Sequence, residues 1–162
     1  MTAPVIFLDI DGVLCTPFSF RLNSLLRLPV ERQRFDPIAL FWLRRLVKRT
    51  GARLVLSSSW RNGLYVDDDW CRAITQNLYD RLARNKTPLT DAAPVHDRGD
   101  KSTEITAWLE EHPCTRYIIL DDNDYCFERE PSVQENWIPV PGDKGLRYPV
   151  YKIALRRLLL PS

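Results

Sequence analysis

The chain contains 162 residues, of which 44% are hydrophobic and 27% charged, a balance typical of one globular domain with a core of ordinary size. Its formal net charge of +2 is too small to indicate nucleic-acid or membrane binding by itself. No apolar stretch approaches the ~20 residues that span a bilayer, and no basic leader of a signal peptide precedes the first apolar run. We therefore expect a cytoplasmic protein with no membrane partner.

The first part of the chain predicts a buried strand, an irregular excursion and a helix. Residues 5–8 are continuously apolar, which is typical of a strand that is covered on both faces. Residues 13–35 have no clean period, and we interpret them as an excursion from the core that could form a hairpin flap. Asp36 is a good N-cap, Pro37 suits the first helical position and Gly51 suits the end, so an amphipathic helix is predicted between them.

The middle of the chain repeats the pattern of strand and helix. Residues 53–56 predict a second buried strand, which three serines follow. A helix is expected from about residue 67 to about residue 85, with acid at its start and basic residues near its end. Residues 87–99 read as a loop, with a short strand around Val95. The whole segment 61–99 thus offers one helix and one loop near the ends of the strands.

The last third predicts a helix capped by Asp100 or Ser102, a buried strand ending in acid at residues 116–122, a short edge strand in "NWIPVP" and a closing helix at 149–160. Strands that alternate with helices indicate a parallel sheet covered on both faces. We predict a single α/β domain over residues 1–162, a doubly wound three-layer sandwich with a mostly parallel sheet.

The cysteines and tryptophans give weaker signals. Four cysteines form no CxxC pair and only two histidines accompany them, so no zinc site is predicted and reduced thiols are expected. Trp42, Trp70 and Trp108 lie on helical stripes and are expected in the core. Trp60 follows the serines, where it could stack on a ring or pack beneath the flap. Arg61 could bind a second phosphate or face water.

Polar side chains follow three predicted buried strands, at the point where each strand ends. Because the carboxyl ends of parallel strands meet at one edge of the sheet, these groups are expected to converge there. Such a convergence is the strongest functional signal in the sequence. The groups are Asp9 and Asp11, Ser57 and Ser58, and Asp121 and Asp122.

This set of groups predicts a phosphoryl-transfer site. Clustered carboxylates favour a hard cation with oxygen ligands, and Mg²⁺ fits because it takes carboxylates, waters and a substrate phosphate. A serine hydroxyl can donate to a phosphate oxygen, and Lys101 adds positive charge near a helix N-terminus. One carboxylate of the first pair can attack phosphorus while the other handles the proton. Gly12 allows the sharp turn that leaves room for a phosphate.

At these residues the sequence resembles the haloacid dehalogenase (HAD) superfamily of phosphohydrolases. The four motifs of that superfamily match "VIFLDIDGVL", "LVLSSSW", Lys101 and "YIILDD", in the expected order. The resemblance implies that Asp9 is the nucleophile and that Asp11 is the acid/base, with its main-chain carbonyl on magnesium. It further implies that Asp122 or Asp121 completes the metal site.

The resemblance leaves the phosphate-binding serine and the substrate open. Ser58 is the preferred serine and Ser57 the next, because the end of the strand is not fixed by the sequence. The "SSSWR" variant and the small size resemble compact HAD proteins that process nucleotides or nucleic-acid ends. Gly12, Trp60 and Arg61 are then candidate substrate contacts.

Such proteins carry little or no cap domain, so the site is expected to be open. It would accept a phosphorylated small molecule or a nucleic-acid end, or a protein partner or second copy acting as a lid. Two other classes of function compete with a magnesium-dependent phosphatase. One is a receiver-like phosphorylation switch, which the order of the motifs disfavours. The other is a catalytically silent binding module, which the intact first pair of acids disfavours.

Overall fold

The computed structural model describes residues 2–95, 100–125 and 127–159. Within these residues, five parallel strands form one sheet in the order β3-β2-β1-β4-β5. The strands are β1 (Val5–Leu8), β2 (Arg53–Leu56), β3 (Leu89–Ala92), β4 (Tyr117–Asp121) and β5 (Trp137–Pro139). The α-helices are α1 (Pro17–Leu25), α2 (Pro37–Thr50), α3 (Asp69–Arg84), α4 (Lys101–Glu111), α5 (Pro131–Asn136) and α6 (Tyr148–Leu159). Among the described residues, the 3₁₀ turns are η1 (Val30–Arg32), η2 (Ser59–Leu64) and η3 (Phe127–Arg129).

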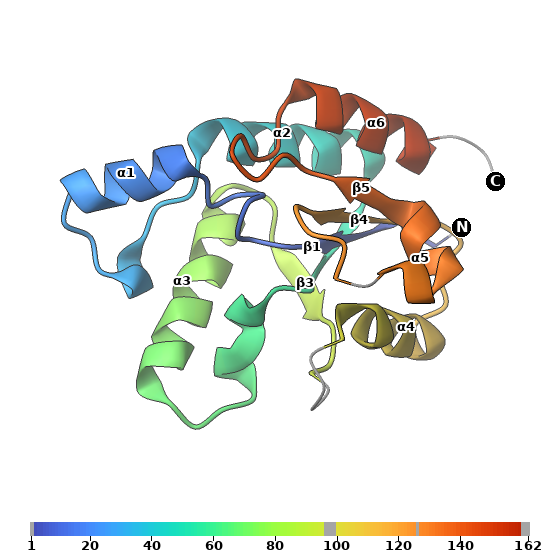
Figure 1. Ribbon diagram of the computed structural model, residues 1–162, viewed down its shortest axis with the longest axis horizontal. Coiled ribbons are helices and arrows are strands. Elements are labelled where there is room, and N and C mark those ends of the chain that lie inside the picture. The colour runs from blue at the N-terminus through green and yellow to red at the C-terminus, as the bar shows by residue number, and fades with distance from the viewer. Residues whose placement is uncertain (1, 96–99, 126, 160–162) are drawn as a thin grey trace.

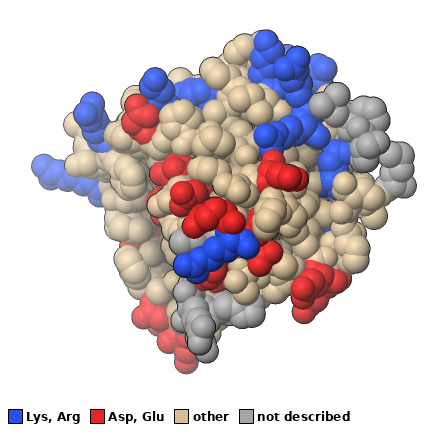
Figure 2. Space-filling view, turned by 45° about the vertical axis from the view of Figure 1, so that its right-hand side comes forward, with Lys and Arg blue, Asp and Glu red and all other residues tan. Residues whose placement is uncertain are grey.

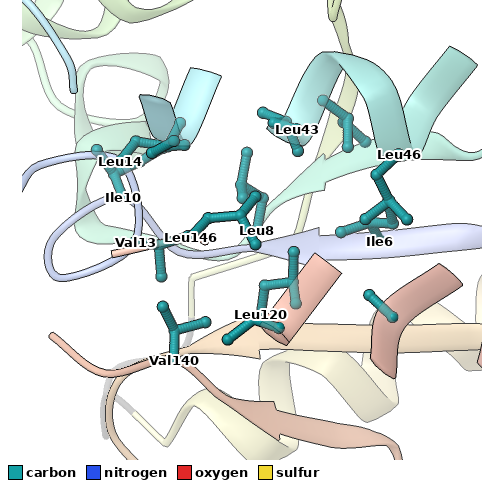
Figure 3. Packing of buried hydrophobic residues seen from close by; sticks show 14 of the residues in the cluster. Ile6, Leu8, Ile10, Val13, Leu14, Leu43, Leu46, Leu120, Val140 and Leu146 are labelled. Carbon is teal, nitrogen blue, oxygen red and sulfur yellow. The ribbon is translucent and has the colours of Figure 1, made fainter. Parts of the chain in front are cut away.

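The central strand β1 divides the interior into two cores, because successive side chains of a strand point to opposite faces of the sheet. Ile6 and Leu8 pack into the larger core, which α2 and α6 cover. Val5 and Phe7 pack into the smaller core beneath α4 and α5. Figure 1 shows these two pairs of helices on opposite sides of the sheet, and Figure 3 shows the aliphatic packing around β1. The predicted three-layer α/β class is therefore confirmed.

The helix boundaries follow the expected capping residues. The Asp36 carboxylate accepts hydrogen bonds from two backbone N–H groups of the first turn of α2, and Gly51 ends that helix in the left-handed region at φ 67°. Asp100 caps α4 by accepting from the Ser102 N–H, so Asp100 rather than Ser102 is the N-cap. The edge position of β5 and the closing helix α6, as far as Leu159, also match the prediction.

Several expectations are wrong. The segment 13–35 contains helix α1 and turn η1 rather than a hairpin, because a reciprocal cap between Thr16 and Ser19 starts a helix there. The short strand lies at Leu89–Ala92 and not around Val95, while the loop residues 96–99 lie outside the described residues. Trp70 is 56% exposed rather than part of the core.

The order of the strands determines where a ligand can bind. From β1 the chain builds the sheet outward through β2 and β3, and then returns to the other side of β1 for β4 and β5. A crevice beyond the carboxyl ends of the strands is expected where the direction reverses, between β1 and β4. Asp9 and Asp121 lie at this point. Within the described residues, no helix has the length and apolar character needed to cross a bilayer.

Candidate active site

A tight turn after β1 brings the first two aspartates to the edge of the sheet. The Asp9 N–H donates to the Leu120 carbonyl on β4 at 3.0 Å, which extends the pairing of β1 and β4 by one residue. The Ile10 carbonyl then accepts from the Leu14 and Cys15 N–H groups, each at 2.9 Å, so the chain turns back at once. Asp9 is therefore buried, whereas Asp11 is an exposed residue whose carboxylate lies against the Trp60 indole.

Lys101 lies between two buried carboxylates. Its Nζ is 3.0 Å from Asp9 Oδ1 and 2.5 Å from Asp121 Oδ2. Burial disfavours the charged ammonium, but the two carboxylates outweigh it and raise the pKa of Lys101. The aromatic ring of Tyr125 lies 4.1 Å from the same ammonium. The first residue of α4 therefore carries a fixed positive charge at the centre of the site.

Three carboxylates of the site lie close enough to share one cation. One oxygen each from Asp9, Asp121 and Asp122 lies within 4.8 Å of the others. The Asp122 carboxylate sits where two glycines leave room, since a Cβ at Gly12 or Gly142 would lie 2.2 Å or 2.6 Å from Asp122 Oδ2. An all-oxygen, acidic donor set of this kind fits Mg²⁺. The residues present are thus compatible with a magnesium site.

The protonation of these acids reflects both burial and mutual repulsion. Burial and the nearby charge of Asp9 raise the pKa of Asp121 to about 7, although Lys101 opposes the shift. Burial and Asp9 also raise the pKa of Asp122. The pKa of Asp11 is raised by the loss of water around its carboxylate, which a hydrogen bond from Trp60 partly offsets. The cluster holds more negative charge than one lysine neutralises.

The serines after β2 have different roles. The Ser57 hydroxyl is buried and has no hydrogen-bond partner among the described residues. The Ser58 side chain instead caps η2 by accepting from the Trp60 N–H at 3.4 Å. A buried hydroxyl without a partner is costly unless a ligand satisfies it. The geometry therefore favours Ser57 over the expected Ser58 as the group available to a phosphate.

The two residues after the serines each have a specific partner, and Trp60 packs against Phe35 at the end of the segment 13–35. Trp60 is half-buried, and its indole Nε1–H donates to Asp11 Oδ2 at 3.1 Å. Arg61 is buried and forms an ion pair with Glu104, so it does not face water. Because Glu104 is three residues after Lys101 on α4, this ion pair joins the serine loop to the helix that carries the lysine.

A cavity of about 300 Å³ brings together the first two aspartates, the serines and Lys101, whereas Asp121, Asp122 and Trp60 are not among its described lining residues. In Figure 2, acidic side chains gather near the middle of the face shown, while most Lys and Arg side chains lie toward its edge. Glu104, Asn62 and Tyr125 line the cavity but were not predicted, because only tertiary packing brings them there. The cavity is lined by Asp9, Asp11, Ser57, Ser58, Ser59, Arg61, Asn62, Val95, Lys101, Glu104 and Tyr125.

A sheet of this topology with an Asp-x-Asp turn, a serine strand end, a helix-borne lysine and a paired acid defines a HAD-type domain. A family model described as the HAD domain in Swiss Army Knife RNA repair proteins matches residues 5–150. The chain belongs to this family. It matches no curated protein. The resemblance to a compact HAD domain is thereby confirmed, and a phosphohydrolase type of activity is the activity that family membership indicates.

Proposed function

We propose that the protein is a magnesium-dependent phosphomonoester hydrolase that forms an aspartyl phosphate on Asp9. The observation that carries the proposal is the shared position of Asp9, the Lys101 ammonium and the unpartnered Ser57 hydroxyl on one cavity. A nucleophile, a cation and a free hydroxyl donor are the groups that a phosphoryl group requires. The cysteine in the same turn is no rival nucleophile, because burial raises the pKa of Cys15.

Each residue then has a defined task. The Asp9 carboxylate attacks phosphorus, and the bond from phosphorus to the leaving oxygen breaks while Asp11 gives that oxygen a proton. Asp11 next takes a proton from a water that attacks the phosphoaspartate, and the bond from phosphorus to Asp9 breaks to release phosphate. The Trp60 indole N–H holds the Asp11 carboxylate for both steps. Such acid–base assistance contributes ~10²–10⁴-fold.

The remaining groups bind and neutralise the phosphoryl oxygens. Ser57 Oγ–H donates to one oxygen, and Lys101 balances charge on Asp9 and on the phosphoryl group. Asp9, Asp121 and Asp122, with the Asp11 carbonyl, would hold Mg²⁺. A bound magnesium ion supplies charge neutralisation for the phosphoryl oxygens.

We further propose phosphorylated nucleotides or nucleic-acid ends as substrates. The family description associates HAD domains of this type with RNA repair proteins. Helix α1 with η1 is the only insertion between β1 and α2 among the described residues, so no large cap domain follows β1 there to keep a bulky end away.

The test is hydrolysis of p-nitrophenyl phosphate with and without Mg²⁺, by wild type, Asp9→Asn and a control with the exposed Asp80→Asn. We expect turnover that needs both the metal and Asp9 and that the control retains. Turnover by Asp9→Asn equal to wild type would overturn the assignment of the nucleophile. A phosphoaspartate that forms but persists without turnover would instead favour the receiver-like switch.

A further inference from the structure

A second pocket of about 270 Å³ adjoins the catalytic cavity. The two share Ser59 and Asn62, both of which are exposed residues of turn η2. A ligand that enters both would therefore pass over this short turn. The second pocket is lined by Val30, Ser59, Trp60, Asn62, Gly63, Trp70, Cys71, Ile74 and Thr75.

Trp60 lines the second pocket and reaches the catalytic cavity through its contact with Asp11. Its indole N–H contacts Asp11 in the catalytic cavity, while the residue lines the second pocket. The ring is held from behind by Phe35, at 5.6 Å between centroids in an edge-to-face arrangement. The Trp60 ring is therefore held in place, and this side of the pocket lies next to Asp11, the group that handles the proton of the leaving oxygen.

The rest of the pocket is built by the first half of α3, which is clamped against η2. Thr75 Oγ1 donates to the Trp60 carbonyl at 2.6 Å and accepts from the Gly63 N–H at 3.1 Å. A Cβ at Gly63 would lie 2.3 Å from the Cys71 carbonyl oxygen, so only glycine permits this close approach. The pocket is thus pre-formed by the close packing of α3 on η2 and by the hydrogen bonds of the Thr75 hydroxyl to the backbone of η2.

Trp70 is a large apolar residue of α3 that does not pack into either hydrophobic core. It sits on the second residue of α3 with 56% of its surface exposed, although the helical pattern places it on the apolar stripe. Its side chain lines the pocket instead. Two tryptophans, a valine and an isoleucine therefore surround a space whose described lining residues carry no charge.

We propose that this pocket binds the nucleobase of the nucleotide whose phosphate occupies the catalytic cavity. The inference rests on the proposed function, because the phosphate must lie beside Asp9. An uncharged, aromatic pocket suits the flat face of a base and not a second phosphate. Base stacking on aromatic side chains is tolerant of sequence, so the pocket selects for a base as such.

The test compares adenosine 3′-monophosphate with glycerol 2-phosphate, which has no base, in wild type and Trp70→Ala. We expect the ratio of the two kcat/KM values to fall by ~5- to 150-fold in the variant. The matched control is Phe41→Ala, because Phe41 is 53% exposed and packs on Trp42 instead of the pocket. An unchanged ratio, including the case in which kcat/KM falls equally for both substrates, would overturn the proposal.

A binding measurement distinguishes a failure of this proposal from a failure of the proposed function. Calorimetry of adenosine 3′-monophosphate with Asp9→Asn protein, with and without Trp70→Ala, needs no turnover. Weaker binding with Trp70→Ala supports the pocket even if the wild type hydrolyses nothing, whereas equal binding contradicts it. A short RNA with a 3′-terminal phosphate, tested beside the mononucleotide, shows which source of nucleotide the site prefers.

Discussion

Two buried carboxylates beside a basic residue have opposite electrostatic character. Asp36 and Asp121 are both 0% exposed. Asp36 accepts from the Ile38 and Ala39 N–H groups at 2.9 and 3.2 Å, and from Thr16 Oγ1 and Arg147 Nη2 at 2.8 and 2.7 Å. Although burial acts to raise the pKa of Asp36, these donors outweigh it and lower the pKa. Its negative charge is fully compensated within the fold.

Asp121 has fewer donors and a like charge beside it. It accepts hydrogen bonds from the Lys101 ammonium and the Asn123 N–H. Burial and the negative charge of Asp9 nevertheless dominate and raise the pKa of Asp121 to about 7. The comparison shows that burial of an acid does not by itself distinguish structure from function. A carboxylate with a full set of donors stabilises the fold, whereas an under-compensated cluster is suited to bind a cation and a substrate.

The largest effect should come from removing the Lys101 ammonium, which is the positive charge within the under-compensated cluster. Lys101→Met leaves Asp9 and Asp121 without their shared partner, so we expect a loss of ~3–5 kcal/mol in the free energy of unfolding at pH 8. Urea denaturation of this variant beside Lys144→Met, which removes an exposed lysine, measures the difference. Equal stability of the two variants would show that the buried ion pairs stabilise nothing.

Removing the compensated carboxylate of Asp36 should lower the free energy of unfolding slightly less than removing Lys101. Asp36→Ala removes the N-cap of α2 and the partner of Arg147, so we expect ~2–4 kcal/mol of destabilisation. The kcat of the folded protein should stay unchanged. If kcat fell while stability stayed the same, Asp36 would belong to the site and the comparison would fail.

The same carboxylate predicts a pH dependence with a definite sign. The pKa of Asp36 is lowered in the folded state, so its contribution is present above the unfolded pKa of ~3.9 and is lost as the pH falls through the lower folded value. Acid unfolding below about pH 4 should therefore be less steep in Asp36→Asn than in wild type. Parallel acid-unfolding curves would contradict this.

Magnesium should stabilise the folded protein through the under-compensated cluster of Asp9, Asp121 and Asp122, and not through Asp36. At one hundred times its Kd, Mg²⁺ adds about 2.7 kcal/mol to the free energy of unfolding. Thermal unfolding with Mg²⁺ or EDTA should show this gain in wild type and in Asp36→Asn, and a smaller gain in Asp122→Asn. A gain that Asp122→Asn retains in full would place the cation elsewhere.

The smallest expected effect is the kinetic difference between substitutions of Ser57 and Ser58. Ser57→Ala removes the unpartnered hydroxyl, so we expect kcat/KM to fall by ~10- to 100-fold, as for the loss of one hydrogen bond to a charged group. Ser58→Ala removes only the cap of η2 and should act on stability. Steady-state kinetics on both variants checks the order, and a larger kinetic loss in Ser58→Ala would reverse it.

The sequence predicts features that depend on neighbouring residues in the chain. Apolar runs that end in acid locate β1 and β4, and the caps Asp36 and Asp100 locate the starts of two helices. The apolar pattern does not predict helix α1, because its apolar side chains, such as Phe18, are largely exposed and form no inward stripe. Its start was nonetheless marked by threonine and proline at the cap.

The site was predictable as a list of residues but not as a set of contacts. The carboxyl ends of parallel strands bring the acids and serines together, so their convergence follows from topology. The choice of Ser57 over Ser58 depends on which hydroxyl the fold leaves unpartnered. The ion pair of Arg61 with Glu104 joins residues far apart in the chain, and no local pattern encodes it.

The most direct test of the account is to locate the phosphoryl group during turnover. The wild-type protein is mixed with Mg²⁺ and a labelled phosphomonoester, quenched in acid, digested and mapped by mass spectrometry. We predict one phosphoryl group on the peptide that contains Asp9, and none in Asp9→Asn. Turnover that proceeds equally in Asp9→Asn, or a phosphoryl group mapped to another residue, would contradict the central claim that Asp9 is the nucleophile.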